Sequence, residues 1–146
     1  MNSALRALQI ETANFGAVRI VASSTHVTSI TFVSKNTKAT TTTDHVTVPT
    51  IGESERTDAS NAVLLQAARE LSEFDAGHRR VFHVPLAFPS NATALQRSVW
   101  KAMLSIPFGE TWSYKDVSVA AGHPTAVRAV ASAIGRNPLP IVVPCH

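Results

Sequence analysis

The spacing of apolar residues changes near residue 90 and divides the chain into two regions of different fold. In the first third, apolar and polar residues alternate with a period of two, as in strands that bury one face. Three segments rich in β-branched residues follow this pattern: 8–12, 17–21 and 27–33. From 58 to 74 the apolar spacing is three and four, which predicts a helix that Gly77 ends. We expect a small antiparallel sheet with a helix, forming an N-terminal α/β (α+β) domain over residues 1–89.

Two further segments of the first region lack clear periodicity. The stretch from Ser34 to Gly52 is rich in threonine, and we expect a variable loop or a weak edge strand there. Residues 81–86 are predicted to be short and extended and to lead into a linker at 87–90.

Hydroxyl capping signals mark the helix starts of the second region. Thr93 with Gln96 three residues later is a capping-box sequence, in which the two side chains satisfy backbone donors at the helix start. The Ile-Pro-Phe-Gly run at 106–109 stops that helix. Ser113 followed by Asp116 offers the same kind of cap to a second helix.

A short turn containing glycine joins the second helix to a third. The second helix is expected to end at Gly122, and Thr125 is expected to cap a third helix that reaches about Ile134. Two short helices joined in this way make a helix-turn-helix candidate. Arg128 is the single long polar side chain of the third helix, whereas helices that read the major groove present several. The small residues of the third helix suit close approach to a narrow groove. An ordinary buried Ala-rich helix would have the same sequence.

Charge and residue usage bound the possible partners and cofactors. The net charge of +3 and a pI near 9.5 permit an anionic partner such as nucleic acid, and equally fit a slightly basic domain. No apolar run of about 18 residues indicates a membrane span, and the first residues do not resemble a signal peptide, so we expect an intracellular protein. One cysteine and six scattered histidines indicate no disulfide and no metal site.

The last residues combine three prolines with the single cysteine. Pro138, Pro140 and Pro144 surround the apolar run 141–143, which we expect to be buried and extended, and Cys145-His146 follows. A thiol becomes a useful nucleophile when a base such as histidine removes its proton. Adjacent side chains of an extended chain point in opposite directions, so this pair needs a bend or a bridging water. By itself the pair is a weak signal, since a buried and inert cysteine has the same sequence.

Five motifs of the second region occur together in one order. They are Gln-Arg-Ser-Val-Trp at 96–100, Ile-Pro-Phe-Gly-Glu-Thr-Trp-Ser-Tyr at 106–114, Arg-Ala-Val at 128–130, Gly-Arg-Asn-Pro at 135–138 and Ile-Val-Val-Pro-Cys-His at 141–146. Residues 93–146 thereby resemble the C-terminal domain of the methylated-DNA–protein-cysteine methyltransferases, also called O6-alkylguanine-DNA alkyltransferases. The first region resembles the variable, ribonuclease-H-like N-terminal domain of that family only in layout.

The resemblance implies direct reversal of DNA damage. Members of the family move a methyl or other alkyl group irreversibly from the O6 atom of guanine, or the O4 atom of thymine, onto a cysteine. It implies a winged-helix-like helix-turn-helix domain over residues 90–146 that binds double-stranded DNA in the minor groove and flips out the damaged base. It also implies a monomer that needs neither a cofactor nor a metal and does not bind membranes.

The resemblance also assigns roles to individual residues. Cys145 corresponds to the nucleophile and alkyl acceptor, and His146 to the general base that acts through a water. Asn137 corresponds to the residue that orients the active-site turn, and Tyr114 to the donor that stabilises charge on the leaving guanine. Arg128 corresponds to the residue that fills the space of the flipped base. The remaining DNA contacts implied are Ser113, Tyr114, Thr125, Ala126 and Ala129.

The chain departs from the family pattern in two places. Members of the family continue beyond the Cys-His pair with an arginine, a glycine-containing loop and a final helix whose glutamate orients the histidine. The sequence is therefore either a naturally shortened member or a fragment or truncated gene model, and we expect the latter. Ala131 stands where a glycine is common in the family, and its methyl group is expected to loosen close groove contact.

Three alternative functions compete with alkyl transfer. A non-catalytic binder of alkylated DNA, or an inactive truncated fragment, is favoured by the missing segment and disfavoured by the presence of Cys145. A transcription regulator is disfavoured by the lack of base-reading side chains on the third helix. A hydrolase or cysteine protease has little support, since no oxyanion loop accompanies the cysteine.

Overall fold

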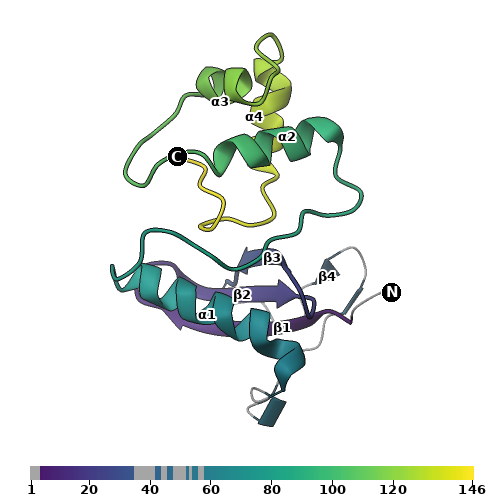
Figure 1. Cartoon of the computed structure of the whole chain (residues 1–146), viewed down its shortest axis with the longest axis vertical. Coiled ribbons are helices and arrows are strands. Elements are labelled where there is room, and N and C mark those ends of the chain that lie inside the picture. The colour runs from purple at the N-terminus through teal and green to yellow at the C-terminus, as the bar shows by residue number, and fades with distance from the viewer. Residues whose placement is uncertain (1–3, 35–41, 44–45, 48–51, 53, 56–57) are drawn as a thin grey trace. The chain divides into compact units, whose positions relative to one another are not determined.

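A computed structural model gives the structure of residues 4–34, 42–43, 46–47, 52, 54–55 and 58–146. The chain divides into two compact units, Met1–Ala87 and Phe88–His146 (Figure 1). The division lies two residues before the end of the N-terminal domain that we expected at residue 89. No helix of the described residues is long and apolar enough to cross a bilayer.

The N-terminal unit contains a three-stranded antiparallel sheet in the order β1-β2-β3. The strands are β1 (Arg6–Thr12), β2 (Gly16–Ala22) and β3 (Val27–Phe32). The register pairs Ile10 with Val18 and Ile20 with Ile30. The three predicted strands and their antiparallel pairing are therefore confirmed.

Helix α1 (Ala62–Asp75) packs against β1 and β2 through a buried face that includes Leu64, Ala67 and Leu71. A 3-10 turn over Ala59–Asn61 precedes it, so the predicted helical segment from Asp58 begins with this tighter turn. Gly77 follows the helix with a φ of 78°, a conformation that glycine adopts without strain.

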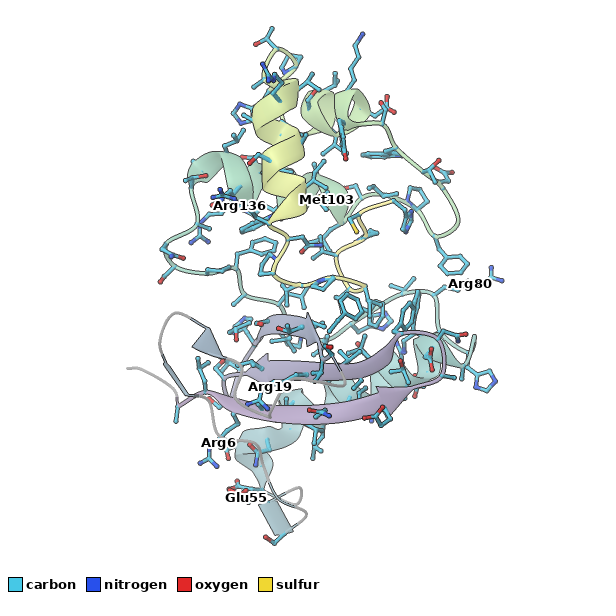
Figure 2. All side chains as sticks on the ribbon, turned by 180° about the vertical axis from the view of Figure 1, so that it is seen from behind. Arg6, Arg19, Glu55, Arg80, Met103 and Arg136 are labelled. Carbon is cyan, nitrogen blue, oxygen red and sulfur yellow. The ribbon has the colours of Figure 1, made fainter. Side chains whose placement is uncertain are left out.

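Side-chain hydrogen bonds tie the C-terminal half of α1 to the sheet and to the segment after the helix. The carboxylate of Asp75 accepts the backbone N–H groups of Ala13 and Asn14 in the β1–β2 turn. Buried Glu70 accepts the N–H groups of His83 and Val84. At the other side of the unit, Arg6 forms an ion pair of 3.0 Å with Glu55 (Figure 2).

The two segments without clear periodicity, 34–52 and 81–86, add no strand to the three-stranded sheet among the residues that the structure describes. Of the Thr-rich stretch, the structure describes two short strands that pair antiparallel, β4 (Thr42–Thr43) and β5 (Val46–Thr47), and most of the stretch lies outside the described residues. Residues 81–86 form a single parallel bridge between Leu86 and Val27 at the start of β3.

The C-terminal unit contains three helices: α2 (Ala94–Met103), α3 (Tyr114–Ala120) and α4 (Val127–Gly135). Both predicted capping boxes are present, Thr93 with Gln96 and Ser113 with Asp116. The three helices contact one another around a core of buried side chains: Val99, Met103, Val117, Val130, Leu139 and Val143. The indole N–H of Trp100 donates to the carbonyl of Ala133 at 2.8 Å and joins α2 to α4 inside this core.

Helices α3 and α4 form the predicted helix-turn-helix, but the prediction that Thr125 caps α4 is wrong. Helix α4 begins at Val127, its N-cap residue is Ala126, and no side chain caps it. The N–H of Ala126 donates to the carbonyl of His123, so a backbone turn leads into the helix. Thr125 lies inside that turn, one residue too early to cap α4.

Candidate active site

The loop between α4 and Cys145 is held by the side chain of Asn137. Its Oδ1 atom accepts the N–H of Leu139 at 2.9 Å, and its Nδ2 atom donates to the carbonyl of Val143 at 2.9 Å. The N–H of Val143 in turn donates to the carbonyl of Leu139 at 2.8 Å. These bonds make residues 137–143 a compact turn.

The predicted extended conformation of residues 141–143 is therefore wrong. Ile141 has a φ of 73°, and it is the one non-glycine residue with a positive φ in the described ranges. The left-handed region is unfavourable for a β-branched residue, so the surrounding bonds must hold it there. The prediction of burial is correct for Val142 and Val143, while Ile141 is half-buried.

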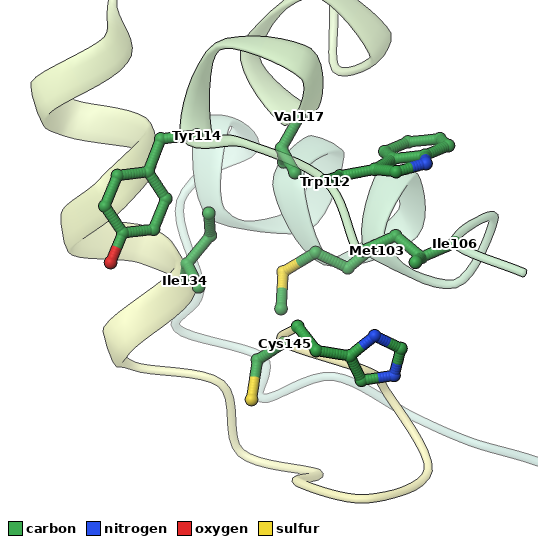
Figure 3. A pocket seen from close by; sticks show the side chains of 8 residues that line it. Met103, Ile106, Trp112, Tyr114, Val117, Ile134 and Cys145 are labelled. Atoms are coloured by element: carbon green, nitrogen blue, oxygen red, sulfur yellow. The ribbon is translucent and has the colours of Figure 1, made fainter. Parts of the chain in front are cut away.

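Cys145 lies at a small pocket of the C-terminal unit (Figure 3). The pocket has a volume of about 10 Å³, about the space of one water molecule, and is partly open to solvent. Apolar side chains from all three helices and from the segment before α3 line it: Met103, Ile106, Trp112, Val117 and Ile134. Tyr114, Cys145 and His146 complete the lining, and the thiol-bearing residue is exposed. A nucleophile at the rim of such a hollow can attack a flat ligand that packs against the apolar lining from outside.

His146 is fixed by two contacts with the segment before α3. Its Nδ1 atom lies 2.6 Å from the carbonyl oxygen of Glu110, and its own carbonyl accepts the N–H of Trp112 at 3.0 Å. The backbone that follows Cys145 is therefore tied to residues 110–112.

Tyr114 reaches the pocket from the first turn of α3. The capping box places it there, because Ser113 and Asp116 hold the start of this helix. The hydroxyl of Ser113, and then its N–H, donate to the carboxylate of Asp116 and lower the pKa of that group below its ordinary value of 3.8. Tyr114 is 56% exposed, so its phenol is accessible to a ligand.

The residues expected to contact DNA lie on the helix-turn-helix. Arg128 and Ala129 are exposed in the first turn of α4, whereas Val130 is fully buried beneath them. Ser113 and Thr125 are also exposed, and Ala126 is half-buried. This surface is separate from the lining of the pocket, except at Tyr114.

Sequence reasoning did not identify several residues of the pocket. Met103, Ile106, Trp112 and Ile134 line it, and the carbonyl of Glu110 holds His146. The run 106–114 is the longest of the five motifs, and its length indicated that this segment contributes to the site. Its sequence contains no periodicity from which the inward-facing side chains could be read.

Comparisons with known proteins agree on one family. Residues 94–146 match the family model described as the DNA binding domain of 6-O-methylguanine DNA methyltransferase. The constitutive methylated-DNA–protein-cysteine methyltransferase of Bacillus subtilis is 48% identical over 83 residues, which are 57% of this chain and 49% of that protein. The corresponding protein of Methanosarcina barkeri is 46% identical over 81 residues, 56% of this chain and 50% of that protein. The chain thus spans about half the length of these curated relatives.

Solved structures extend the likeness to both units. The O6-methylguanine methyltransferase of Mycobacterium tuberculosis superposes with a TM-score of 0.77 at 29% identity, over 97% of this chain and 76% of that one. A structure of the M. tuberculosis protein in complex with DNA matches with a TM-score of 0.73 at 28% identity and the same coverage.

Proposed function

Because residues 94–146 place this chain in the methylated-DNA–protein-cysteine methyltransferase family, we propose that it repairs alkylated DNA by taking the alkyl group onto Cys145. The substrate is double-stranded DNA that contains O6-alkylguanine or, as a second lesion, O4-alkylthymine. The C-terminal region 90–146 binds the DNA and carries the reaction, and residues 1–89 form the variable N-terminal domain. A protein with this substrate acts where genomic DNA is, inside the cell.

The reaction is a single displacement at the alkyl carbon. His146 accepts the thiol proton of Cys145 through a water, and the thiolate attacks the carbon bonded to guanine O6. The sulfur–carbon bond forms as the carbon–oxygen bond breaks, and the electron pair stays on the guanine. The guanine then takes up one proton, which balances the proton lost by the thiol. The thioether cannot be reversed by the protein, so each molecule repairs one lesion.

Tyr114 and Asn137 support this displacement in different ways. The phenol of Tyr114 donates a hydrogen bond to the leaving guanine, where negative charge develops as the carbon–oxygen bond breaks. Asn137 does not touch the base. Its bonds to Leu139 and Val143 position the turn that carries Cys145.

Access to the lesion requires that the base leave the DNA stack. The exposed start of α4 carries small residues and one cation, Arg128, which suits insertion into the minor groove rather than reading of the major groove. Arg128 fills the space of the flipped base, and Ser113, Thr125, Ala126 and Ala129 contact the surrounding strands. A monomer suffices, because one unit holds both the DNA-binding helices and the cysteine.

One observation carries the proposal: the single cysteine of the chain lies at the rim of an apolar pocket, beside Tyr114 and His146. The flat base packs against this apolar lining, while the thiol and the two polar groups meet the reacting atoms. The residues that line this pocket fall within the segment that the family model matches.

The test is the intact mass of the protein after incubation with a duplex that contains O6-methylguanine. We expect a gain of one methyl group, carried by the peptide that contains Cys145, and no gain in Cys145→Ala. An undamaged duplex of the same sequence is the control for non-specific adducts. A folded sample that binds the lesion in gel-shift experiments without gaining mass would contradict alkyl transfer and support a non-catalytic lesion binder.

A further inference from the structure

A broad groove lies on the exposed face of α3. It has a volume of about 730 Å³ and is open to solvent. Lys115, Asp116, Val119 and Ala120 line it from α3, and residues 110–112 line it from the segment before this helix. The four helical residues are all exposed, and they form two pairs spaced by four residues, so they share one side of the helix.

The groove contains apolar and aromatic surface. Val119 is more than half exposed, and Ala120 beside it is also exposed. Trp112 is half-buried and lines both this groove and the pocket at Cys145. In Figure 3, Trp112 and Tyr114 lie on opposite sides of that pocket. Exposed apolar surface with a polar rim is typical of an interaction site, and tryptophan is among the residues that contribute most to binding there.

The acidic residues of the C-terminal unit are gathered at this groove. Residues 88–146 contain two of them, Glu110 and Asp116, and both line it. The carboxylate of Glu110 forms no hydrogen bond or ion pair with any residue that the structure describes. Of the five cations in residues 88–146, Lys115 alone lines the groove, and the other four are Arg97, Lys101, Arg128 and Arg136. The groove therefore attracts positive charge on a unit whose other charges are positive.

Shape and charge together decide which kind of occupant fits. Two carboxylates repel the phosphates of nucleic acids and of anionic lipids. A groove this open cannot enclose most of a small molecule, as ligand pockets do. A segment of another protein needs no such enclosure. An arginine of that segment can stack on Trp112 and pair with Glu110, and an apolar neighbour can cover Val119.

We propose that this groove binds a partner protein through a segment in which arginine stands beside an apolar residue. None of the residues that we propose to contact DNA lines the groove, so the partner and DNA bind to different surfaces. The inference goes beyond the proposed repair function and does not depend on it.

The experiment measures binding of two fluorescein-labelled peptides to the full chain by fluorescence anisotropy, without DNA. One peptide repeats Arg-Leu-Ser and the other repeats Glu-Leu-Ser at the same length. We expect the arginine peptide to bind and the glutamate peptide not to bind, although the chain has a net charge of +3. An acidic peptide would be favoured if net charge alone decided.

Variants of the groove localise the binding. Glu110→Gln should weaken it roughly two- to fivefold, the effect of one exposed ion pair, and Val119→Lys roughly tenfold, because it places a cation in the groove. Trp112→Ala should weaken binding by more than about tenfold and Trp112→Phe by less, since phenylalanine keeps an aromatic face. Glu11→Gln removes an exposed carboxylate of β1 and is the matched control, which should bind like the parent. Thermal unfolding checks that every variant is folded.

Three results would overturn the inference. Equal affinity of the parent and Val119→Lys would place the peptide elsewhere, and spermidine bound as tightly as the arginine peptide would make the occupant a small cation. Self-association in sedimentation experiments that Val119→Lys abolishes, with no peptide binding, would assign the groove to a second copy of the chain. None of these readouts uses DNA or methyl transfer. A failure of the proposed repair function is therefore distinguished from a failure of this inference.

Discussion

The side-chain amide of Asn137 donates to the carbonyl of Val143 across 2.9 Å, two residues before the single cysteine of the chain. The same amide accepts the N–H of Leu139 through its oxygen. One side chain thus closes the loop that leaves α4 and holds Ile141 in the left-handed region. The position of Cys145 depends on a residue that lies eight positions earlier in the sequence.

Replacement of Asn137 by alanine is expected to weaken the fold and the reaction together. Two hydrogen bonds are lost in a part-buried loop, and about 1–3 kcal/mol of stability should be lost with them. Urea unfolding measures this change, and the mass assay measures methyl transfer under conditions where the variant remains folded. We expect slower transfer even there, because the strained turn no longer fixes Cys145.

Asn137→Asp separates the two bonds of this side chain. A carboxylate still accepts the N–H of Leu139 but cannot donate to the carbonyl of Val143. We expect a rate of transfer closer to that of the alanine variant than to that of the parent. Parent-like transfer by both variants would contradict a positioning role for Asn137.

The local elements of this fold were predictable from the sequence. The hairpin formed by β1 and β2 follows from alternating apolar residues around a turn, and the two capping boxes follow from Thr93 and Ser113 with their partners three residues later. Each of these signals involves residues that are neighbours in the chain. Interactions between neighbouring residues are therefore sufficient to predict the hairpin and the two caps, and all three are present in the structure.

Three features escaped prediction, each because a hydrogen bond that the residue's own propensity does not reveal decides the local structure. Thr125 has a capping side chain, yet the turn closed between His123 and Ala126 determines where α4 begins. Ile141 favours extended backbone, but the bonds of Asn137 force it into a turn. The contact between His146 and Glu110 spans 36 positions and involves a main-chain atom, which no side-chain pattern reveals.

Arg128→Ala is expected to slow repair of duplex DNA by roughly 10- to 100-fold, because the flipped base loses the group that takes its place. Transfer from the free base O6-methylguanine should not change, since that substrate needs no extrusion. The exposed position of Arg128 predicts no loss of stability. Single-turnover rates with the two substrates measure the difference.

Lys101→Ala is the control for the loss of one positive charge, because Lys101 is an exposed cation on α2. The salt dependence of duplex binding adds a second criterion. A residue that only contacts phosphate lowers the salt slope by about one when it is removed, whereas a residue inserted in the stack changes it little. Equal slowing of free-base and duplex reactions by Arg128→Ala would rule out a role in base flipping.

The cap of α3 predicts a defined loss of stability in acid. Hydrogen bonds from the hydroxyl and the N–H of Ser113 lower the pKa of Asp116 in the folded state below 3.8. Stability from this ionised carboxylate is present above about pH 4, the unfolded value, and is lost as the pH falls through the lower folded value. Thermal unfolding between pH 6 and pH 2.5 should show a steeper acid decline for the parent protein than for Asp116→Asn.

The comparison of these two proteins isolates Asp116. The pKa values of Asp58 and Asp75 are also lowered, but both groups are present in the parent and in the variant. Their contribution to the acid decline therefore cancels in the difference. Identical acid declines for the two proteins would show that the capping carboxylate is not coupled to folding.

Tyr114→Phe is expected to separate chemistry from binding and folding. The phenol is 56% exposed, so its loss should leave stability within about 0.5 kcal/mol of the parent. Removal of one donor to developing charge slows comparable reactions by roughly 100- to 1,000-fold, and we expect a loss of this order in single-turnover methyl transfer. Binding of the damaged duplex should change little, because the aromatic ring remains to contact the base.

Val119→Ala is the matched control for this last variant, since Val119 is 57% exposed on the same helix and lies outside the lining of the pocket. It should transfer methyl groups at the parent rate. If Tyr114→Phe also reacted within about twofold of the parent, electrostatic stabilisation of the leaving guanine by the phenol would be refuted. If it instead lost binding and transfer in equal proportion, Tyr114 would hold the base in the ground state, and the donor for the leaving group would have to lie elsewhere in the pocket.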